Sequence, residues 1–426
     1  MQHHLIDIDI HNGFRAIKEA HVHIDGISVI SGINGSGKST ISKLLYTTFK
    51  NALQYENIVV DIINEKLMPY SDALTQMQMQ MSPSTTASRR HLYRWRLRNK
   101  EKKSSYLTRV REFCDRFIKE VEESHDADIM MSERMWRILY GAVNEQITDL
   151  PVLLDKLQQL ISKALDEGFL LLAERPRDIL NNRMSRQFGQ VVDDFVRISE
   201  YGDAFIGANE GKVPLPHYIQ QVVYIDTPMI LGLDLFDAPE YWTDLYDLLR
   251  NPANVDFDNH IFKLLQTEIM HGEAQYDEEA ADEFLFKRED GQTFELFKCA
   301  TGIKSFSILQ LLLKNGTLGN NTLLIIDEPE AHLHPQWIIE YARMVLLLHK
   351  RLGVKFLIAS HSTDFVGAIK EISAATDVKD INFYLAEETD YMQYKYCDLG
   401  FEIEPIFASF NKSFEKLDNY AKPEEL

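Results

Sequence analysis

The chain has 426 residues, of which 45% are hydrophobic and 26% charged, so it can bury one large core or two smaller ones and is neither a disordered tail nor a fibre. Its net charge of -20 excludes a protein that coats nucleic acid with its whole surface, because phosphate binding needs a local excess of cations. Three cysteines without CxxC spacing exclude a disulfide framework and a zinc ribbon. Without a membrane-spanning apolar run or an N-terminal leader, we expect a cytoplasmic protein with no membrane partner.

The first fifty residues predict three strands followed by a helix. Alternating apolar and polar residues indicate strands over residues 5–10 and 20–24, and an apolar run over residues 27–30 predicts a buried strand. From Thr40 onward, apolar residues recur at helical spacing. The glycine-rich segment 32–39 therefore lies between a buried strand and a helix.

Segment 32–39 reads GINGSGKS and matches the phosphate-binding P-loop pattern GxxxxGK[ST]. Its glycines let backbone N–H groups turn toward phosphates, and the helix N-terminus adds positive potential. Lys38 can reach the β- and γ-phosphates, Ser39 can hold Mg2+, and Thr40 supports the loop. We therefore predict ATP and Mg2+ as cofactors. The predicted nucleotide-binding residues of the loop are Gly32, Asn34, Gly35, Ser36, Gly37, Lys38, Ser39 and Thr40.

The middle of the chain predicts an inserted helical domain. Residues 71–88 are rich in Met, Gln, Ser and Thr, which indicates a flexible connection. Residues from about 90 to 200 have apolar positions at intervals of three and four, without the sustained heptads of long coiled-coil arms. We expect residues 1–70 to form the N-terminal part of the sheet domain, 71–215 the insertion, and 216–426 the C-terminal part.

A basic stretch lies within this insertion, between Arg89 and Arg111, where ten cations face one acidic residue. Because Tyr93, Trp95 and Tyr106 are interleaved with the cations, the stretch could follow a phosphate backbone and stack on bases. An acidic partner, self-association or a solvated helix face explains it equally well. Nucleic acid is therefore one candidate partner of Arg89–Arg111.

The second half of the chain predicts strands that alternate with helices. Apolar runs indicate buried strands over residues 222–225, 323–326 and 356–359, and helical spacing follows Gly302 and Pro335. This alternation implies a mainly parallel sheet with right-handed crossovers. The predicted fold class is therefore α/β, a P-loop NTPase with a mainly parallel sheet and an inserted helical domain.

The apolar strand that begins at Thr322 ends in two adjacent carboxylates, Asp327 and Glu328. Beside a P-loop, such a pair brings one carboxylate to the metal and the other to the water that attacks the third phosphate. We predict that Asp327 and Ser39 bind Mg2+. Glu328, with Lys38, is predicted to be catalytic.

Three further stretches carry a family resemblance. Thr301 and Gly302 precede a helix at the place of an ABC signature loop, with Thr, Ile and Lys replacing the usual Ser, second Gly and Gln. The run EPEAHLHP over residues 328–335 occupies the D-loop position, and His361, which we also predict to be catalytic, matches the switch histidine that contacts the γ-phosphate. The chain thus resembles ABC-type ATPases of the RecF and structural-maintenance-of-chromosomes branch, especially overcoming-lysogenization-defect ATPases and the PtuA ATPase of Septu-type phage defence.

This resemblance implies an ABC-type ATPase that works as an ATP-switched homodimer or higher homo-oligomer, in which each Thr301-Gly302 loop closes on the P-loop of another copy. It further implies a bacterial anti-phage sensor that controls a separate effector, such as a nuclease or toxin. We expect His332 and His334 to form hydrogen bonds at the subunit contact and not to bind metal. No Q-loop glutamine can be placed, since Asp226 follows the strand 222–225.

Other functions stay open from the sequence. A DNA repair or chromosome-maintenance ATPase would use the same switch to clamp DNA, and long arms or a strongly basic face would favour it. A transporter subunit would have a standard signature and a membrane-docking surface, which EPEAHLHP argues against. A scaffold that binds ATP without hydrolysis would not need Glu328.

Overall fold

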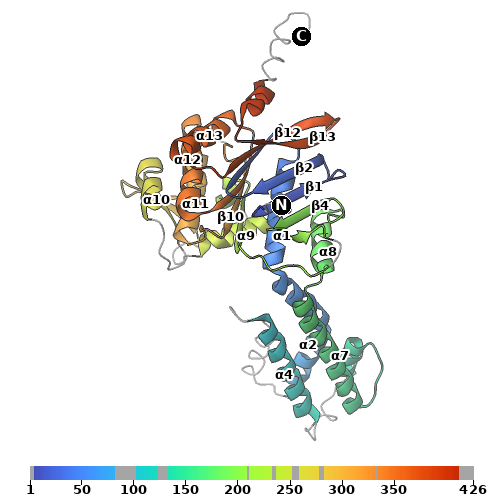
Figure 1. Ribbon diagram of the computed structural model, residues 1–426. Coiled ribbons are helices and arrows are strands. Elements are labelled where there is room, and N and C mark those ends of the chain that lie inside the picture. Colours follow the sequence, from blue (N-terminus) through green and yellow to red (C-terminus); the bar gives the residue numbers. More distant parts are fainter. Residues whose placement is uncertain are drawn as a thin grey trace, which may run out of the picture. The chain divides into compact units, whose positions relative to one another are not determined.

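The computed structural model describes residues 4–81, 102–122, 133–208, 211–232, 237–251, 259–277, 283–331 and 333–411. The chain divides into two compact units (Figure 1). We call Met1–Leu53 with Arg177–Leu426 the sheet unit, and Gln54–Pro176 the helical unit.

The sheet unit is built on a ten-stranded sheet in the described residues, with the order β5-β4-β1-β2-β13-β12-β3-β11-β10-β6. Its strands are β1 (Ile6–Ile10), β2 (Ile17–Ile24), β3 (Ile27–Ser31), β4 (Val196–Glu200), β5 (Asp203–Ile206), β6 (Gln221–Ile225), β10 (Thr322–Asp327), β11 (Lys355–Ser360), β12 (Ile381–Asp390) and β13 (Gln393–Gly400). The neighbours β12, β3, β11, β10 and β6 are parallel, and we call them the parallel half. In the other half, only β13 and β2 pair in parallel.

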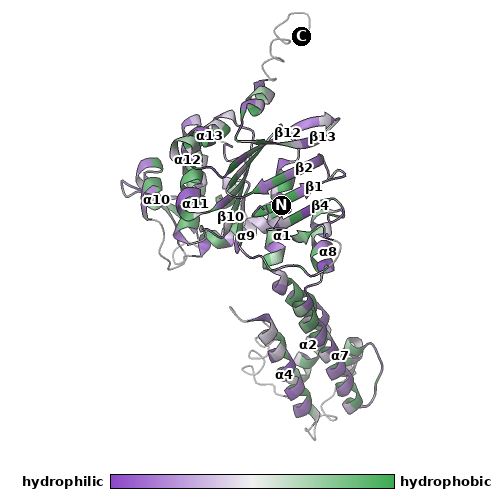
Figure 2. Ribbon diagram, viewed as in Figure 1, coloured by the Kyte–Doolittle hydropathy of each residue, from purple (hydrophilic) through white to green (hydrophobic). Residues whose placement is uncertain are grey.

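The two halves of the sheet differ in how their strands are buried. Every residue of β3 and β10 is buried, as expected for parallel strands covered on both faces. In β1, buried isoleucines alternate with partly exposed aspartates. Figure 2 shows the resulting concentration of hydrophobic strands at the centre of the sheet unit. The predicted α/β class with a large, mainly parallel sheet is confirmed.

Helices cover both faces of the parallel half. In the described residues, the helices of the sheet unit are α1 (Lys38–Leu53), α8 (Arg177–Phe188), α9 (Glu240–Arg250), α10 (Asn259–Lys263), α11 (Thr301–Lys314), α12 (Pro335–Leu352) and α13 (Thr363–Thr376), with the short turns η1 (Pro228–Gly232), η2 (Leu264–Ile269) and η3 (Leu296–Lys298). In Figure 1, α11, α12 and α13 lie together on one side of the sheet and α1 lies on the other. Helices α9 to α13 share one continuous apolar core with the strands. A separate antiparallel sheet contains β7 (Gly272–Asp277), β8 (Glu283–Arg288) and β9 (Thr293–Glu295).

The ends of the helices that flank the sheet follow from local chemistry. Ser362 caps α13, because its side chain accepts a hydrogen bond of 3.2 Å from the backbone N–H of Phe365. Gly353 ends α12 with a φ of 74°, a left-handed conformation that costs glycine little. These two ends place β11 directly between α12 and α13.

The helical unit contains α2 (Tyr55–Met81), α4 (Lys103–Glu122), α6 (Glu133–Val143) and α7 (Leu150–Glu174). Asp149 caps α7, since its side chain accepts from the N–H of Val152. The helices pack closely where α7 has Gly168, because a Cβ there would lie 3.0 Å from both Ile63 and Leu107. No helix in the described ranges is long and apolar enough to cross a membrane.

The boundaries of the units differ from those expected. Helix α2 continues to Met81, because Met, Gln and Leu are good helix formers, so no flexible connection begins at residue 71; residues 82–88 lie outside the described part. The helical unit is 54–176 and not 71–215. Residues 196–200, expected to be helical, form β4, which pairs with β1 and so belongs to the sheet.

Candidate nucleotide-binding site

The candidate site lies at the carboxyl ends of three neighbouring parallel strands. The P-loop follows β3, His361 follows β11, and Asp327 ends β10. The strand registers place Ser31 opposite Ser360 and Asp327 opposite Ala359, so the three ends are level. This is the edge of an open parallel sheet at which ligands bind.

The conformation of the P-loop requires its glycines. Gly35 and Gly37 have φ values of 83° and 96°, which disfavour a side chain. A Cβ at Gly37 would also lie 2.6 Å from Ile17. From β13, the hydroxyl of Tyr396 donates to the carbonyl of Ser36 at 3.2 Å. The loop is therefore held by both its own backbone and the neighbouring strands.

A cleft of about 300 Å³ opens beside the P-loop. It is lined by Arg15, Ala16, Asn34, Gly35, Gly37, Lys38, Ser39, Thr40 and Glu328. Most of the predicted loop residues thus line one cleft together with Glu328. Gly32 and Ser36 do not line it: a Cβ at Gly32 would lie 2.7 Å from Ala386, and Ser36 is 1% exposed. Gly32 and Ser36 therefore lie on the buried side of the loop, away from the cleft.

Lys38 lies over the loop with its ammonium group at the cleft. Its Nζ donates to the carbonyl oxygens of Gly32 at 2.8 Å and Ile33 at 3.1 Å. Burial lowers the pKa of Lys38, and the negative charges of Glu328, Asp327 and Glu330 oppose this shift. A buried cation whose hydrogen bonds go to two backbone carbonyls can exchange them for phosphate oxygens.

Asp327 is 6% exposed and has both carboxylate oxygens engaged. Ser42 donates to Oδ1 at 2.5 Å, and the hydroxyl of Tyr224 donates to Oδ2 at 2.8 Å. Burial raises the pKa of Asp327, and hydrogen bonds from Ser42, Ser39 and Tyr224 oppose that shift. The hydroxyl of Ser39 and this carboxylate are hard oxygen donors of the kind that Mg2+ prefers, so the residues fit the predicted ion.

Glu328 turns away from the direction of β10 and lines the cleft. Its φ of 49° is uncommon for a residue with a side chain, and its N–H donates to the carbonyl of Ala359 at 2.7 Å. Such a backbone persists only where the surroundings hold it, and it is found often at functional sites. The turn separates the two acids: Asp327 stays buried near Ser39, and Glu328 reaches the cleft.

Glu330 and His361 form a second pair of polar side chains at the same strand ends. One oxygen of Glu330, Oε1, accepts from Ser360 Oγ at 2.9 Å and from the backbone N–H of His361 at 2.7 Å. The same oxygen lies 3.2 Å from Nδ1 of His361, which is 3.6 Å from Oε1 of Glu328. The other oxygen of Glu330, Oε2, is buried without a hydrogen-bond partner. We call these residues, with Glu328, the switch cluster.

The predicted signature residues do not line the cleft of their own chain. Thr301 begins α11, and the side chain of Ala300 provides no cap. Gly302 is required for packing, since a Cβ there would lie 2.4 Å from the ring of Trp337. In the first turn of α11, Ser305 lines a cavity of about 10 Å³ with Asp327 and Glu328, which is room for about one water.

The two histidines of the EPEAHLHP run and the basic stretch Arg89–Arg111 lie only partly within the described residues. His334 caps α12, because its Nδ1 accepts from the N–H of Gln336 at 3.4 Å, and His332 lies outside the described part. Of the basic stretch, residues 89–101 lie outside it as well. Arg111 forms an ion pair of 2.5 Å with Asp166 and lies over the ring of Phe169.

Sequence reasoning missed four residues that the structure places at the site: Arg15, Ser42, Tyr224 and Glu330. The repeated acid of EPE was a signal for Glu330, and the spacing of Ser42 from Ser39 was a signal for a hydroxyl on the same turn of α1. Arg15 has a φ of 56° and donates to the carbonyl of Phe188. No sequence pattern indicates that contact.

At the Q-loop position, Asp226 accepts from Trp242 at 2.7 Å, and burial raises the pKa of this acid.

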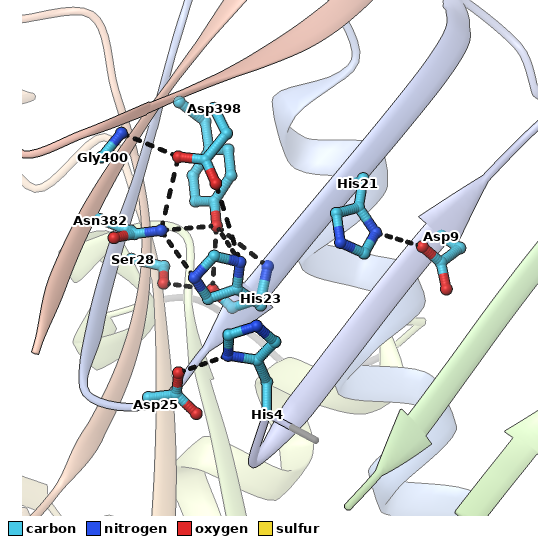
Figure 3. Close-up of polar contacts among 10 residues, drawn as sticks. His4, Asp9, His21, His23, Asp25, Ser28, Asn382, Asp398 and Gly400 are labelled. Atoms are coloured by element: carbon cyan, nitrogen blue, oxygen red, sulfur yellow. Dashed lines mark hydrogen bonds and ion pairs between the residues drawn. The ribbon is translucent and has the colours of Figure 1, made fainter. Parts of the chain in front are cut away.

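A separate set of acids and histidines lies on β2 and the strands beside it (Figure 3). His4, His23 and Asp25 each offer a ligand atom within 4.8 Å of the others. The two histidine rings are stacked with centroids 3.9 Å apart, so one ion cannot lie in both ring planes at bonding distance. Tyr384 and Asn382 contact the two ring nitrogens of His23, and Asp25 pairs with His4. We call this hydrogen-bonded group the sheet cluster.

Comparison with known proteins gives one family match. The family described as "AAA domain, putative AbiEii toxin, Type IV TA system" matches residues 84–366. This segment includes Asp327, Glu328 and His361 and begins after the P-loop. No curated protein matches.

The similar solved structures include heads of Smc proteins. The Pyrococcus furiosus Smc head domain with an extended coiled coil, bound to the C-terminal domain of ScpA, is 11% identical over 98% of this chain and 99% of that chain, with a TM-score of 0.35. The SmcHead bound to the C-winged helix domain of ScpA is 10% identical over 94% of this chain and 98% of that chain, with a TM-score of 0.38.

The family can be assigned from the geometry and the match together. A loop with the P-loop pattern, the buried carboxylate of Asp327 and a glutamate with positive φ meet at level ends of parallel strands, which is the arrangement of a P-loop ATPase domain. The family model matches more than half of the chain. The chain therefore belongs to the family described as "AAA domain, putative AbiEii toxin, Type IV TA system".

Proposed function

We propose that the protein binds ATP with Mg2+ and hydrolyses it to ADP and phosphate. The observation that carries this proposal is the division of the two acids after β10, in which Glu328 lines the P-loop cleft and Asp327 stays buried beside Ser42 and Tyr224. Two adjacent acids with one role each are what hydrolysis needs, whereas nucleotide binding alone does not need the strained Glu328.

Each residue of the cleft then has a defined task. Backbone N–H groups from Asn34 to Thr40 bind the phosphates, and Lys38 leaves its carbonyl partners to bind the β- and γ-phosphates. Ser39 and Asp327 would hold Mg2+, which neutralises charge on the phosphate oxygens. Glu328 orients a water for attack on the γ-phosphorus and accepts its proton as the bond to the β-phosphate oxygen breaks.

We further propose that two copies form the complete site. Thr301 and Gly302 lie at the start of α11 and not at the cleft of their own chain, although the N–H groups of a helix N-terminus suit a phosphate. A second copy that places its α11 over the cleft would complete the cradle. ATP would then hold the dimer together, and hydrolysis would release it.

The biological role that we propose is a nucleotide-switched sensor of a bacterial anti-phage defence system that controls a separate effector, a nuclease or a toxin. The EPEAHLHP run supports this branch of ATPases, and the family description, which names a toxin of a Type IV TA system, fits a defence setting. The stretch Arg89–Arg111 is the proposed contact for nucleic acid, because it combines cations with Tyr93 and Trp95; Tyr106 is buried and has no part in this contact.

The variant Glu328→Gln tests the composite site. It removes the base and keeps the binding groups, so ATP should remain bound and the dimer should persist, as measured by light scattering after gel filtration. Lys38→Ala is the matched control, in which ATP should produce no dimer. A Glu328→Gln protein that stays monomeric while it retains ATP would rule out the dimer.

A further inference from the structure

The structure assigns a role to Glu330, which we propose positions the switch histidine: its carboxylate accepts from the backbone N–H of His361 and lies beside Nδ1, which leaves Nε2 for the nucleotide. The inference rests on the proposed ATPase function. It adds a residue that does not line the cleft and acts through His361. Glu330 therefore differs in kind from Glu328, which lines the cleft itself.

The burial of Glu330 is the first argument. Its side chain is 5% exposed, and a buried carboxylate is expensive unless hydrogen bonds or a nearby cation compensate it. Oε1 accepts two hydrogen bonds, both from the end of β11, and Oε2 has no partner. Because the two donors belong to the consecutive residues Ser360 and His361, the carboxylate holds the end of β11 in place.

The surroundings of the His361 ring are the second argument. Nδ1 faces two carboxylate oxygens, Glu330 Oε1 at 3.2 Å and Glu328 Oε1 at 3.6 Å. A ring nitrogen between two negative acceptors is the one that carries hydrogen. Nε2, on the far side of the ring, is then the nitrogen that remains for a phosphate oxygen.

A chain of hydrogen bonds extends this control beyond the histidine. Ser360 Oγ donates to Glu330 and accepts from the N–H of Ser362 at 3.1 Å. Ser362 in turn caps α13 through the N–H of Phe365. Glu330 lies on the segment between β10 and α12, so this network joins that segment to the start of α13. A displacement of the segment would move His361 as well.

The key experiment is a double-mutant cycle with Glu330→Gln and His361→Gln, read as kcat and KM for ATP. Gln keeps the size and a neutral acceptor but loses the charge that orders the ring. We expect kcat to fall at least about tenfold with KM within twofold, because positioning acts on the reaction and not on ATP binding. In the double variant, kcat should equal that of His361→Gln alone. Independent, multiplying losses would overturn the proposal.

Ser360→Ala provides the matched control. It removes one donor to Glu330 and leaves the ring of His361 untouched, so kcat should stay within about threefold of the wild-type protein. A loss of kcat as large as that of Glu330→Gln would mean that Glu330 acts only through its hydrogen bonds to the end of β11. That result would contradict a specific role of the carboxylate charge on the His361 ring.

The 15N spectrum of histidine-labelled protein separates this inference from the ATPase proposal, since it needs no turnover. The signals of His361, assigned by their loss in His361→Gln, should show hydrogen on Nδ1 in the wild-type protein and a lower share of that form in Glu330→Gln. The form with hydrogen on Nε2 in the wild-type protein would refute the positioning role, whether or not ATP is hydrolysed.

Discussion

Two groups of acids and histidines lie on the same sheet, and they differ in how far the chain satisfies their polar atoms. In the switch cluster, Glu330 Oε2 and His361 Nδ1 are buried without a hydrogen-bond partner of good geometry, and Glu328 is the member that lines the cleft. In the sheet cluster, both ring nitrogens of His23 have partners, and His4 pairs with Asp25 (Figure 3). Buried polar groups are nearly always paired, so the unpaired atoms of the switch cluster need an explanation that the sheet cluster does not.

The position of each cluster in the sheet explains this difference. The switch cluster lies at the carboxyl ends of parallel strands, where the chain must leave the sheet and side chains converge from several strands. The sheet cluster lies on the face of the sheet and includes β2, whose antiparallel pairing with β1 sets Asp7 opposite His23 and Asp9 opposite His21. Cross-strand pairs of this kind satisfy one another within the sheet.

The largest expected difference between the two regions is in ATP affinity, when Lys38 of the P-loop or a residue of the sheet cluster is replaced. Lys38→Ala removes the cation that binds the β- and γ-phosphates and should weaken ATP binding at least about 100-fold. In the sheet cluster, His23→Asn should leave ATP affinity unchanged, because its ring contacts lie away from the cleft. Titration calorimetry with ATP measures both. Equal losses of ATP affinity in Lys38→Ala and His23→Asn would contradict the functional difference between the two regions.

A methyl group at the start of α11 should affect stability. Gly302→Ala would place a Cβ 2.4 Å from the rigid ring of Trp337, so we expect the free energy of unfolding to fall by about 1–3 kcal/mol. Urea denaturation measures this loss. Trp337→Leu in the same chain should restore part of it by making room. A Gly302→Ala protein of wild-type stability would show that α11 can shift away from α12.

Removal of the Tyr224 hydroxyl, which donates to the carboxylate of Asp327, should have a smaller effect. Tyr224→Phe removes the 2.8 Å hydrogen bond to Asp327 and keeps the ring. We expect turnover to fall about tenfold at low Mg2+, because the ionised carboxylate loses one of its donors. A Mg2+ titration of ATP turnover tests this, with Tyr241→Phe as the neighbouring control. An unchanged Mg2+ requirement would show that Tyr224 only packs.

The smallest effect belongs to an ion pair that is remote from both clusters. His349 Nε2 lies 2.9 Å from Asp380, and this hydrogen bond lowers the pKa of the Asp380 carboxyl. A lowered pKa stabilises the fold above the ordinary value of 3.8, and the contribution is lost as the pH falls through the folded-state pKa. Asp380→Asn should therefore cost less than about 1 kcal/mol at pH 7, since the acid is partly exposed, and nothing at low pH. Denaturation at both pH values tests this sign.

The sequence predicted the parts of the fold that local patterns encode. The strand before Gly32 and the strand before Asp327 were predicted because their apolar runs are bounded by glycine or by acids. Residues 196–200 were not, because a five-residue strand beside long helices has no strong pattern of its own and depends on pairing with β1. The end of the insertion was misplaced for the same reason.

The site was predicted where a motif names the residue. Lys38, Asp327 and Glu328 have fixed spacing from an apolar strand, and the structure places Lys38 and Glu328 at one cleft with Asp327 behind it. Tyr224 and Arg15 could not be found in this way, since each reaches the site from a strand or loop that only the tertiary fold brings near. Their roles depend on long-range packing.

The rate of phosphate release from ATP by purified protein tests the central claim most directly. The wild-type protein with Mg2+ should release phosphate, and Glu328→Gln should slow that release at least about 100-fold while ATP stays bound. Asp25→Asn, in the sheet cluster, should release phosphate within about twofold of the wild-type rate. Equal rates for the wild-type protein and Glu328→Gln would contradict the assignment of the cleft as a hydrolytic site.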